Sequence, residues 1–186
     1  MKRFSVVMCV VLGVCMIATT SDAQFNILDI DVNLSYPMPQ GDFADGYKAG
    51  FGAGADVFVG LPMLSALKLG GRVAYNRFGV EDIVDGGNMS IIEILPSARF
   101  EISPPMSPVG GFAQLGVGLY NWSSTIEMKG LPDAEDDGAD FGICVGAGVK
   151  VKIPGSVGLM AMPLYHIIFT EDEKTNYLSL NVGVIF

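Results

Sequence analysis

The sequence predicts an all-β fold: an eight-stranded antiparallel up-and-down transmembrane β-barrel, preceded by a cleaved signal peptide. The chain is 50% hydrophobic, yet nothing after its first segment approaches the roughly 20 apolar residues of a membrane helix. Its apolar residues instead alternate with polar ones, which is the period of a strand with different surroundings on its two faces. Short uncharged connections also alternate with longer acidic ones.

The N-terminal segment has the features of an export signal. Lys2 and Arg3 are followed by an apolar run and then by small residues that a signal peptidase recognises. We therefore expect a signal peptide over 1–23 and an outer-membrane β-barrel domain over 24–186. The run is too short for a transmembrane helix, and a lipoprotein signal at Cys15 is an alternative that the bulky residue before it disfavours.

Composition disfavours nucleic-acid binding and an intrachain disulfide. Without the signal, 9 basic and 19 acidic residues remain, a formal net charge of −10, which is unsuited to nucleic acid. Cys144 is then the remaining cysteine, so no intrachain disulfide is expected. No motif calls for a cofactor.

The first four strands each have one apolar face. They are expected at 28–36, 47–59, 66–78 and 89–102. Their opposite faces carry Asp29, Asp31, Asp56, Lys68, Arg72, Glu93, Arg99 and Glu101. Strand proline removes a backbone donor, so Pro96 should mark a bulge or a local break.

The last four strands repeat this scheme with fewer charges. They are expected at 109–122, 139–153, 157–169 and 176–186. The second of them has the clearest alternation, with Lys150 and Lys152 joining the charged face. The third is apolar on both faces and contains Pro163, a second expected bulge or break.

The cost of placing a charge in lipid determines which face of the strands points to the membrane and which to the interior. Each Arg or Lys at the middle of the lipid face would cost about 2–4 kcal/mol, so the charged face should line the interior. Five acids then meet five bases there. We expect Glu93, Glu101 or Asp56 to hold each of Arg72 and Arg99, with inward glycines making room for the long cations. This predicts a plugged polar interior, because an eight-stranded barrel is just wide enough for side chains to fill it.

The connections orient the barrel. The short turns at 60–65, 103–107 and 154–156 should face the periplasm, together with both termini. The longer connections, including 123–138, are acidic and should face outward. Aromatic residues near strand ends should form interfacial belts. They are Tyr36, Tyr47, Tyr75, Trp122, Tyr165, Phe169 and Phe186.

The signal, the alternation, the turn asymmetry and a last strand ending on Phe together carry a family resemblance. The chain resembles the eight-stranded outer-membrane barrels typified by the transmembrane domain of outer membrane protein A and the opacity-type porins. The resemblance implies a bacterial outer-membrane location, contact with lipid and lipopolysaccharide, and recognition of the last strand by the barrel-assembly machinery. It implies no activity, and no periplasmic peptidoglycan-binding domain is expected after the barrel. The expected assembly residues are Tyr177, Leu180, Val182, Val184 and Phe186.

Catalysis has little support in the sequence. Lipid A deacylases of this architecture use a His followed two residues later by Ser, whereas Ile168 follows His166 here. Cys144 lies among glycines, and we expect it to be a small buried side chain with a packing role. Interior carboxylates could do acid–base chemistry, but ion pairing accounts for them more simply. The glycines at 50–54 lie within a strand, so they do not form a phosphate-binding loop.

One acidic stretch is a candidate metal loop. Its carboxylates could collect Ca²⁺ or Mg²⁺, but they lack the spacing of an EF-hand. The residues are Asp133, Glu135, Asp136 and Asp137. Solvated acidic loops that bridge divalent ions to lipopolysaccharide are the simpler interpretation.

Three functional hypotheses follow. We favour a non-enzymatic, monomeric outer-membrane protein with an envelope-structural or surface-contact role. The alternative is a narrow porin-like channel, or a carrier for a small or apolar solute. A soluble lipocalin-like barrel is disfavoured, because it would place the apolar face inside and the charges outside.

Overall fold

The computed structural model describes residues 28–62, 64–80, 86–104, 107–127, 134–153, 157–170 and 174–186. Within them the elements are β1 (Leu28–Gln40), α2 (Phe43–Gly46), β2 (Tyr47–Leu61), β3 (Leu64–Val80), β4 (Gly86–Ile102), β5 (Val109–Glu127), β6 (Ala134–Lys152), β7 (Gly158–Phe169) and β8 (Lys174–Ile185). The predicted signal peptide, 1–23, lies outside the described residues. No helix in the described part of the chain is long and apolar enough to cross a membrane.

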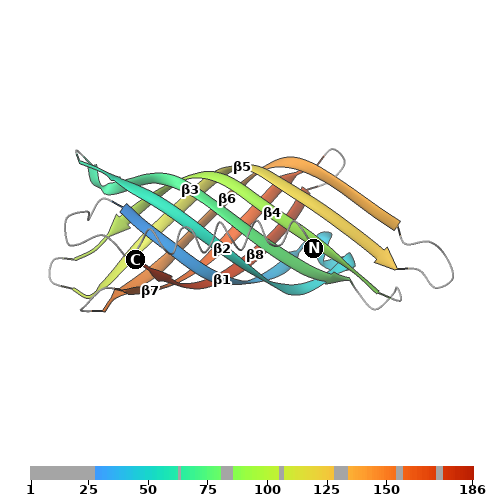
Figure 1. Ribbon diagram of the computed structural model, residues 1–186, viewed down its shortest axis with the longest axis horizontal. Coiled ribbons are helices and arrows are strands. Elements are labelled where there is room, and N and C mark those ends of the chain that lie inside the picture. Colours follow the sequence, from blue (N-terminus) through green and yellow to red (C-terminus); the bar gives the residue numbers. More distant parts are fainter. Residues whose placement is uncertain are drawn as a thin grey trace.

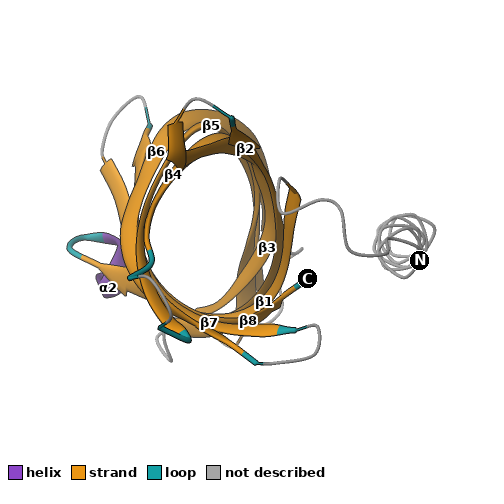
Figure 2. Ribbon diagram, turned by 90° about the vertical axis from the view of Figure 1, so that its left-hand side faces the viewer, coloured by secondary structure: helices purple, strands orange, loops and turns teal. Residues whose placement is uncertain are grey.

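The strands form a closed barrel (Figure 1 and Figure 2). Each strand pairs antiparallel with its neighbours in sequence, and β1 closes the sheet by pairing with β8. Closure removes the free edges that an open sheet would expose. The predicted eight-stranded up-and-down barrel is confirmed. We call the end that carries Leu28 and Phe186 the Phe186 end, and the opposite end the α2 end (Figure 1).

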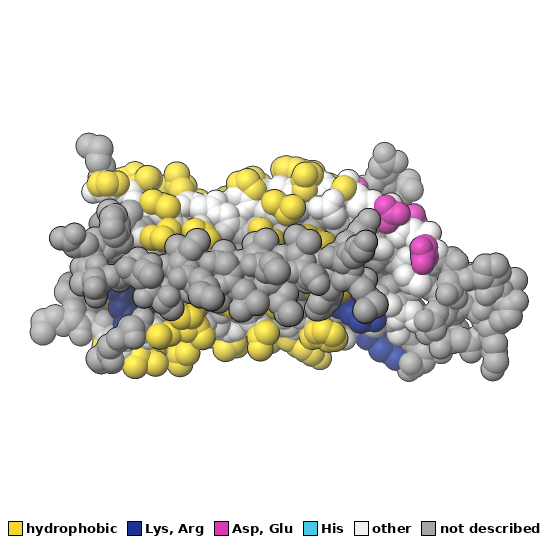
Figure 3. Space-filling model, viewed as in Figure 1, with side chains coloured by type: hydrophobic (Ala, Val, Ile, Leu, Met, Phe, Trp, Pro, Cys, Tyr) yellow, Lys and Arg dark blue, Asp and Glu magenta, His cyan; other side chains and the backbone are white. Residues whose placement is uncertain are grey.

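The two faces of the wall differ as the alternation predicts. Leu34 and its cross-strand partner Val182 are 71% and 64% exposed on the outside, whereas Asn33 and Asn181 beside them are each 1% exposed. Apolar side chains cover much of the visible outer wall, and acidic side chains gather toward the α2 end (Figure 3). Such an exterior suits hydrocarbon, where charged groups are costly.

The hairpin of β5 and β6 is longer than predicted. Its ladder continues past Trp122 opposite Gly138 to Ile126 opposite Ala134. The expected acidic loop over 123–138 is therefore wrong at both ends. Backbone pairing between two adjacent strands continues here through residues whose composition favours a loop, because each added pair extends a ladder that already exists.

Both strand prolines interrupt one ladder without shifting its register. The β4–β5 pairs skip from Ile94 opposite Leu119 to Ser97 opposite Gly116, while the β3 side of Pro96 stays paired. The β6–β7 ladder has the same gap beside Pro163. Local breaks, rather than bulges, are the outcome of the missing donors.

Candidate functional site in the barrel interior

The predicted interior charges point inward and divide into two groups at different depths. The central network contains Asp31, Asp56, Arg72, Glu93 and Arg99. The Phe186-end cluster contains Asp29, Lys68, Glu101, Lys150 and Lys152. The central network thus has one acid in excess, and the cluster has one base in excess.

Arg72 joins three strands from the middle of the barrel. Its Nη1 lies 2.9 Å from Asp56 Oδ2 on β2, and its Nε lies 3.1 Å from Glu93 Oε2 on β4. Its Nη2 donates to Asn181 Oδ1 on β8 at 2.9 Å. A planar guanidinium can serve three acceptors at once, which a single ammonium cannot do in the same geometry. Arg72 is 1% exposed, so these contacts replace its water.

Arg99 finds a different carboxylate from the one expected. It forms an ion pair with Asp31 at 2.5 Å and donates to Gln114 Oε1 from Nη2 at 2.9 Å. The guanidinium lies 4.0 Å from the centre of the Phe58 ring and 4.7 Å from that of Phe112. The expectation that Glu93, Glu101 or Asp56 would hold Arg99 is wrong. Alternation fixes which side a residue faces, whereas strand tilt and stagger decide which residues share a depth.

Uncharged side chains join the two arginine sites. Gln114 Nε2 donates to Asp56 Oδ1 at 3.0 Å, and Asn33 Nδ2 donates to Asp56 Oδ2 at 2.9 Å. Tyr177 on β8 donates to Glu93 Oε1 on β4 at 2.6 Å. These two strands stand opposite each other in the closed order, so the bond crosses the barrel. Sequence reasoning selected charges and missed these amides and hydroxyls, although alternation places them inward.

His166 belongs to this interior rather than to an accessible catalytic site. Its Nε2 lies 3.0 Å from Ser179 Oγ, and its Nδ1 lies 3.0 Å from Tyr120 Oη and 3.8 Å from Glu93 Oε1. Ser, His and Glu in this order have the composition of a hydrolytic triad. However, Ser179, His166 and Glu93 are each 0% exposed, and none of them lines either described cavity. The serine comes from the neighbouring strand β8. It therefore could not be found by inspecting the residue two positions after His166.

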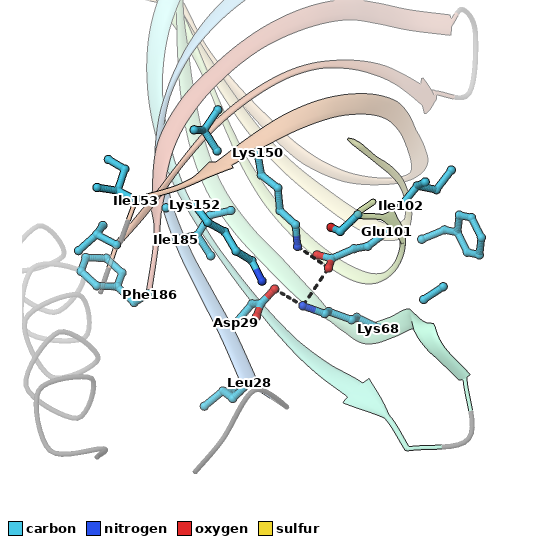
Figure 4. A pocket seen from close by; sticks show the side chains of 16 residues that line it. Leu28, Asp29, Lys68, Glu101, Ile102, Lys150, Lys152, Ile153, Ile185 and Phe186 are labelled. Carbon is cyan, nitrogen blue, oxygen red and sulfur yellow. Dashed lines mark hydrogen bonds and ion pairs between the residues drawn. The ribbon is translucent and has the colours of Figure 1, made fainter. Parts of the chain in front are cut away.

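The Phe186 end holds charged pairs beside a cavity of about 800 Å³ (Figure 4). Lys68 bridges Asp29 and Glu101, at 3.1 Å for the latter, and Lys150 also pairs with Glu101. Lys152 lines the same cavity without an ion pair to the other described residues, and its ammonium points toward this cluster. The cavity leaves these groups closer to water than the central network.

The α2 end is apolar and aromatic. Phe43 of α2 is buried, with its ring centre 4.8 Å from that of Tyr47 and 5.1 Å from that of Phe78. Tyr47 and Trp122 are partly buried against this interior cluster. The expectation that these two residues join an outer aromatic belt is therefore wrong. Tyr36, Tyr75, Phe169 and Phe186 are outward and at least 37% exposed.

The inward glycines of β6 make room mainly for aromatic rings. A Cβ at Gly138, Gly142 or Gly148 would lie within 2.7 Å of the rings of Trp122, Tyr120 and Phe112, respectively. All three rings belong to β5, which pairs with β6. The expectation that glycines make room for long cations applies instead on β2, where a Cβ at Gly54 would meet Arg72 Nη2 at 3.3 Å. Cys144 is buried and free.

The acidic candidate metal loop is largely strand. Glu135, Asp136 and Asp137 belong to β6, and Asp133 lies outside the described residues. Consecutive strand residues point to opposite faces, so these three carboxylates do not converge. Among the residues that the structure describes, no group of three or more His, Cys, Asp or Glu could hold a metal ion.

The predicted assembly residues divide between the two faces of β8. Leu180, Val182 and Phe186 are exposed on the outside. Val184 is half-buried on that side, whereas Tyr177 is buried inside and bonded to Glu93.

A closed barrel with an apolar exterior and a polar interior defines an integral membrane β-barrel protein. Residues 7–186 match the family described as outer membrane protein beta-barrel domain. The chain belongs to this family and is a protein of the bacterial outer membrane.

Two solved structures share the fold. Neisserial surface protein A is 17% identical with a TM-score of 0.61, and the match covers 85% of this chain and 95% of that chain. The attachment invasion locus protein Ail of Yersinia pestis is 17% identical with a TM-score of 0.57, covering 87% and 100%. At these identities the likeness establishes the fold. No curated protein sequence matches the chain.

Proposed function

We propose that this chain is a non-enzymatic outer-membrane barrel whose interior is closed by the central network and whose α2 end makes surface contacts. The observation that carries the proposal is the burial of Arg72 and Arg99 among carboxylates and amides from β1, β2, β4, β5 and β8. An envelope-structural role follows, because such an interior joins many strands and leaves little space for a solute.

A passing ion would have to separate or displace the partners of Arg72 and Arg99. Separating one buried pair leaves a charge without a partner and costs several kcal/mol. We therefore expect wild-type protein to conduct poorly.

Planar-bilayer recording of refolded protein tests the closed interior. Wild-type protein should show little conductance, and Arg72→Ala should raise it by removing the side chain that joins β2, β4 and β8. Arg77→Ala is the matched control, because Arg77 lies on the same strand but is exposed. A high wild-type conductance, unchanged in Arg72→Ala, would overturn the proposal.

A narrow channel or solute carrier is the second candidate. The observation that favours it is the pair of cavities, about 800 Å³ at the Phe186 end and about 320 Å³ at the α2 end. A wild-type conductance that varies with solute size would move this function to first place.

The absence of enzymatic activity is part of the proposal. Its support is the burial of Ser179, His166 and Glu93. Refolded protein should not hydrolyse ester-linked acyl chains of lipids in the same vesicles. Hydrolysis that disappears in Ser179→Ala, with the barrel still folded, would contradict this expectation.

Assembly should depend on the last strand. We infer that the Phe186 end faces the periplasm and that the barrel-assembly machinery recognises the outward face of β8 there. Deleting Phe186 should lower the amount of heat-modifiable protein in outer-membrane fractions, whereas Phe186→Tyr keeps a ring and should retain most of it. Equal amounts of the wild-type and deleted proteins would contradict this role.

The acidic residues at the α2 end should determine which molecules the surface binds. Ail of Yersinia pestis has been crystallised with the heparin analogue sucrose octasulfate. This chain is acidic toward its α2 end, at Asp42, Asp45 and the residues 135–137, which disfavours polyanions. We propose that the monomer instead associates with lipopolysaccharide through divalent ions. Retention on heparin, or lipopolysaccharide binding that a chelator leaves unchanged, would contradict this proposal.

A further inference from the structure

The cavity at the α2 end is lined by aromatic, apolar and polar side chains. Its volume is about 320 Å³, at the small end of the range of about 300–1,000 Å³ for small-molecule sites. Its described lining includes the aromatic Phe43, Tyr47 and Trp122, the apolar Met89 and Ile168, and the carboxylate of Asp136. It is separate from the central network, so binding there requires no passage through the barrel.

The aromatic walls are fixed by contacts of their own. Trp122 Nε1 donates to Asp140 Oδ2 at 2.7 Å, and its ring lies so close to Gly138 that a Cβ there would meet it at 2.7 Å. Tyr47 Oη lies 3.0 Å from Ser124 Oγ. A site that is ordered before its ligand arrives loses less conformational entropy on binding.

Asp136 supplies the charge of the site. It lies on the same side of β6 as Asp140, is exposed, and lines the cavity. Asp140 accepts the bond from Trp122, whereas Asp136 has no hydrogen bond or ion pair within the described part of the chain. A carboxylate beside aromatic rings attracts organic cations, because the ring faces carry negative electrostatic potential.

We propose that this cavity binds a small organic cation with an apolar body, such as a quaternary ammonium compound. The apolar body packs against Phe43, Met89 and Ile168, and the cationic group lies beside Trp122 and Asp136. An anion is disfavoured by Asp136. A neutral molecule of the same shape lacks the electrostatic attraction and binds less tightly.

The chain contains its own reporter, since Trp122 is the single tryptophan in the sequence. Refolded full-length protein in zwitterionic vesicles is titrated with choline and with 3,3-dimethylbutan-1-ol, its neutral isostere. Choline should change Trp122 emission saturably, with an affinity roughly tenfold or more above that of the alcohol. Equal affinities, or no saturable change with choline, would overturn the proposal.

Two aspartate variants separate a specific contact from the general acidity of this end. Asp136→Asn should remove most of the preference for choline. Asp137→Asn removes the same charge from the opposite face of β6 and should leave the preference intact. Equal loss in both variants would overturn the site in favour of a general electrostatic effect. Because the readout is emission rather than conductance, an open barrel would contradict the closed interior without affecting this result.

Discussion

The central network and the Phe186-end cluster use different cations to pair with interior carboxylates. Both place basic side chains against carboxylates inside one barrel. The central cations are Arg72 and Arg99, whereas the cluster uses three lysines, Lys68, Lys150 and Lys152. The side chains of Arg72, Asp56 and Glu93 are 0% exposed, whereas those of Lys68, Glu101 and Lys150 are 10%, 9% and 6% exposed and border a cavity of about 800 Å³.

Access to water accounts for the choice of cation in each region. Arginine carries five donors in a plane and is weakly hydrated, so it suits a dry site with several acceptors. Lysine is a strongly hydrated point charge, which suits the edge of a cavity where water can complete its shell. Free energies of unfolding, measured in denaturant with protein refolded in lipid vesicles, test that distinction.

The largest effect is expected for Arg72→Ala. It removes the cation shared by Asp56 and Glu93, and an unpaired buried charge typically costs about 3–5 kcal/mol. Arg77→Ala, at an outward position near the α2 end of the same strand, should change stability by about 1 kcal/mol or less. Similar losses in the two variants would show that burial does not distinguish these arginines.

A charge moved to the other side of the wall should also be costly. Val145 is 50% exposed on the outside of β6, and Val145→Arg should cost about 2–4 kcal/mol in lipid. Val145→Leu is the control, since it keeps the position apolar. Gly146 on the inner face is unsuitable as a control, because a Cβ there would lie 2.2 Å from Pro163 O. A tolerated Val145→Arg would contradict the assignment of this face to lipid.

Arg72→Lys tests geometry with the charge retained. One ammonium cannot reach Asp56, Glu93 and Asn181 as the guanidinium does, so we expect a loss of about 2 kcal/mol. The same denaturation measurement detects it. A variant as stable as wild type would show that charge alone matters in the central network.

The smallest effect is expected at the Phe186 end. Lys150→Gln removes one partner of Glu101, but Lys68 remains 3.1 Å from that carboxylate and the neighbouring cavity can admit water, so the loss should be about 1 kcal/mol. Lys150→Arg should be within about 0.5 kcal/mol of wild type. Losses as large as that of Arg72→Ala would remove the contrast between the two regions.

The faces of the barrel could be predicted from the sequence because strand alternation is local. Inward Asp56 and outward Val57 follow from their positions and from the cost of charge in lipid. The partner of Arg99 could not be predicted, because Asp31 is three strands away and reaches the same depth only through strand tilt and stagger.

The positions of two aromatic residues and the role of the inward glycines were predicted wrongly, because each residue type was considered without its neighbours on the paired strand. Tyr47 and Trp122 lie near strand ends, but their inward positions place them in the interior instead of at the lipid boundary. The spaces beside Gly138, Gly142 and Gly148 depend on rings from β5, so they become visible only when two strands are paired in register. The lengths of β5 and β6 likewise depend on pairing.

The crosswise contacts of β8 have a consequence for how long the folded barrel lasts. Tyr177 and Asn181 hold Glu93 and Arg72 on β4 and β3, and β8 reaches its final place only when it pairs with β1. We therefore expect these contacts to form at or after closure of the β1–β8 seam. Interactions made that late slow unfolding more than they accelerate folding. These contacts thus slow unfolding of the barrel, and the lifetime of the native state depends on β8, the strand that completes the interior.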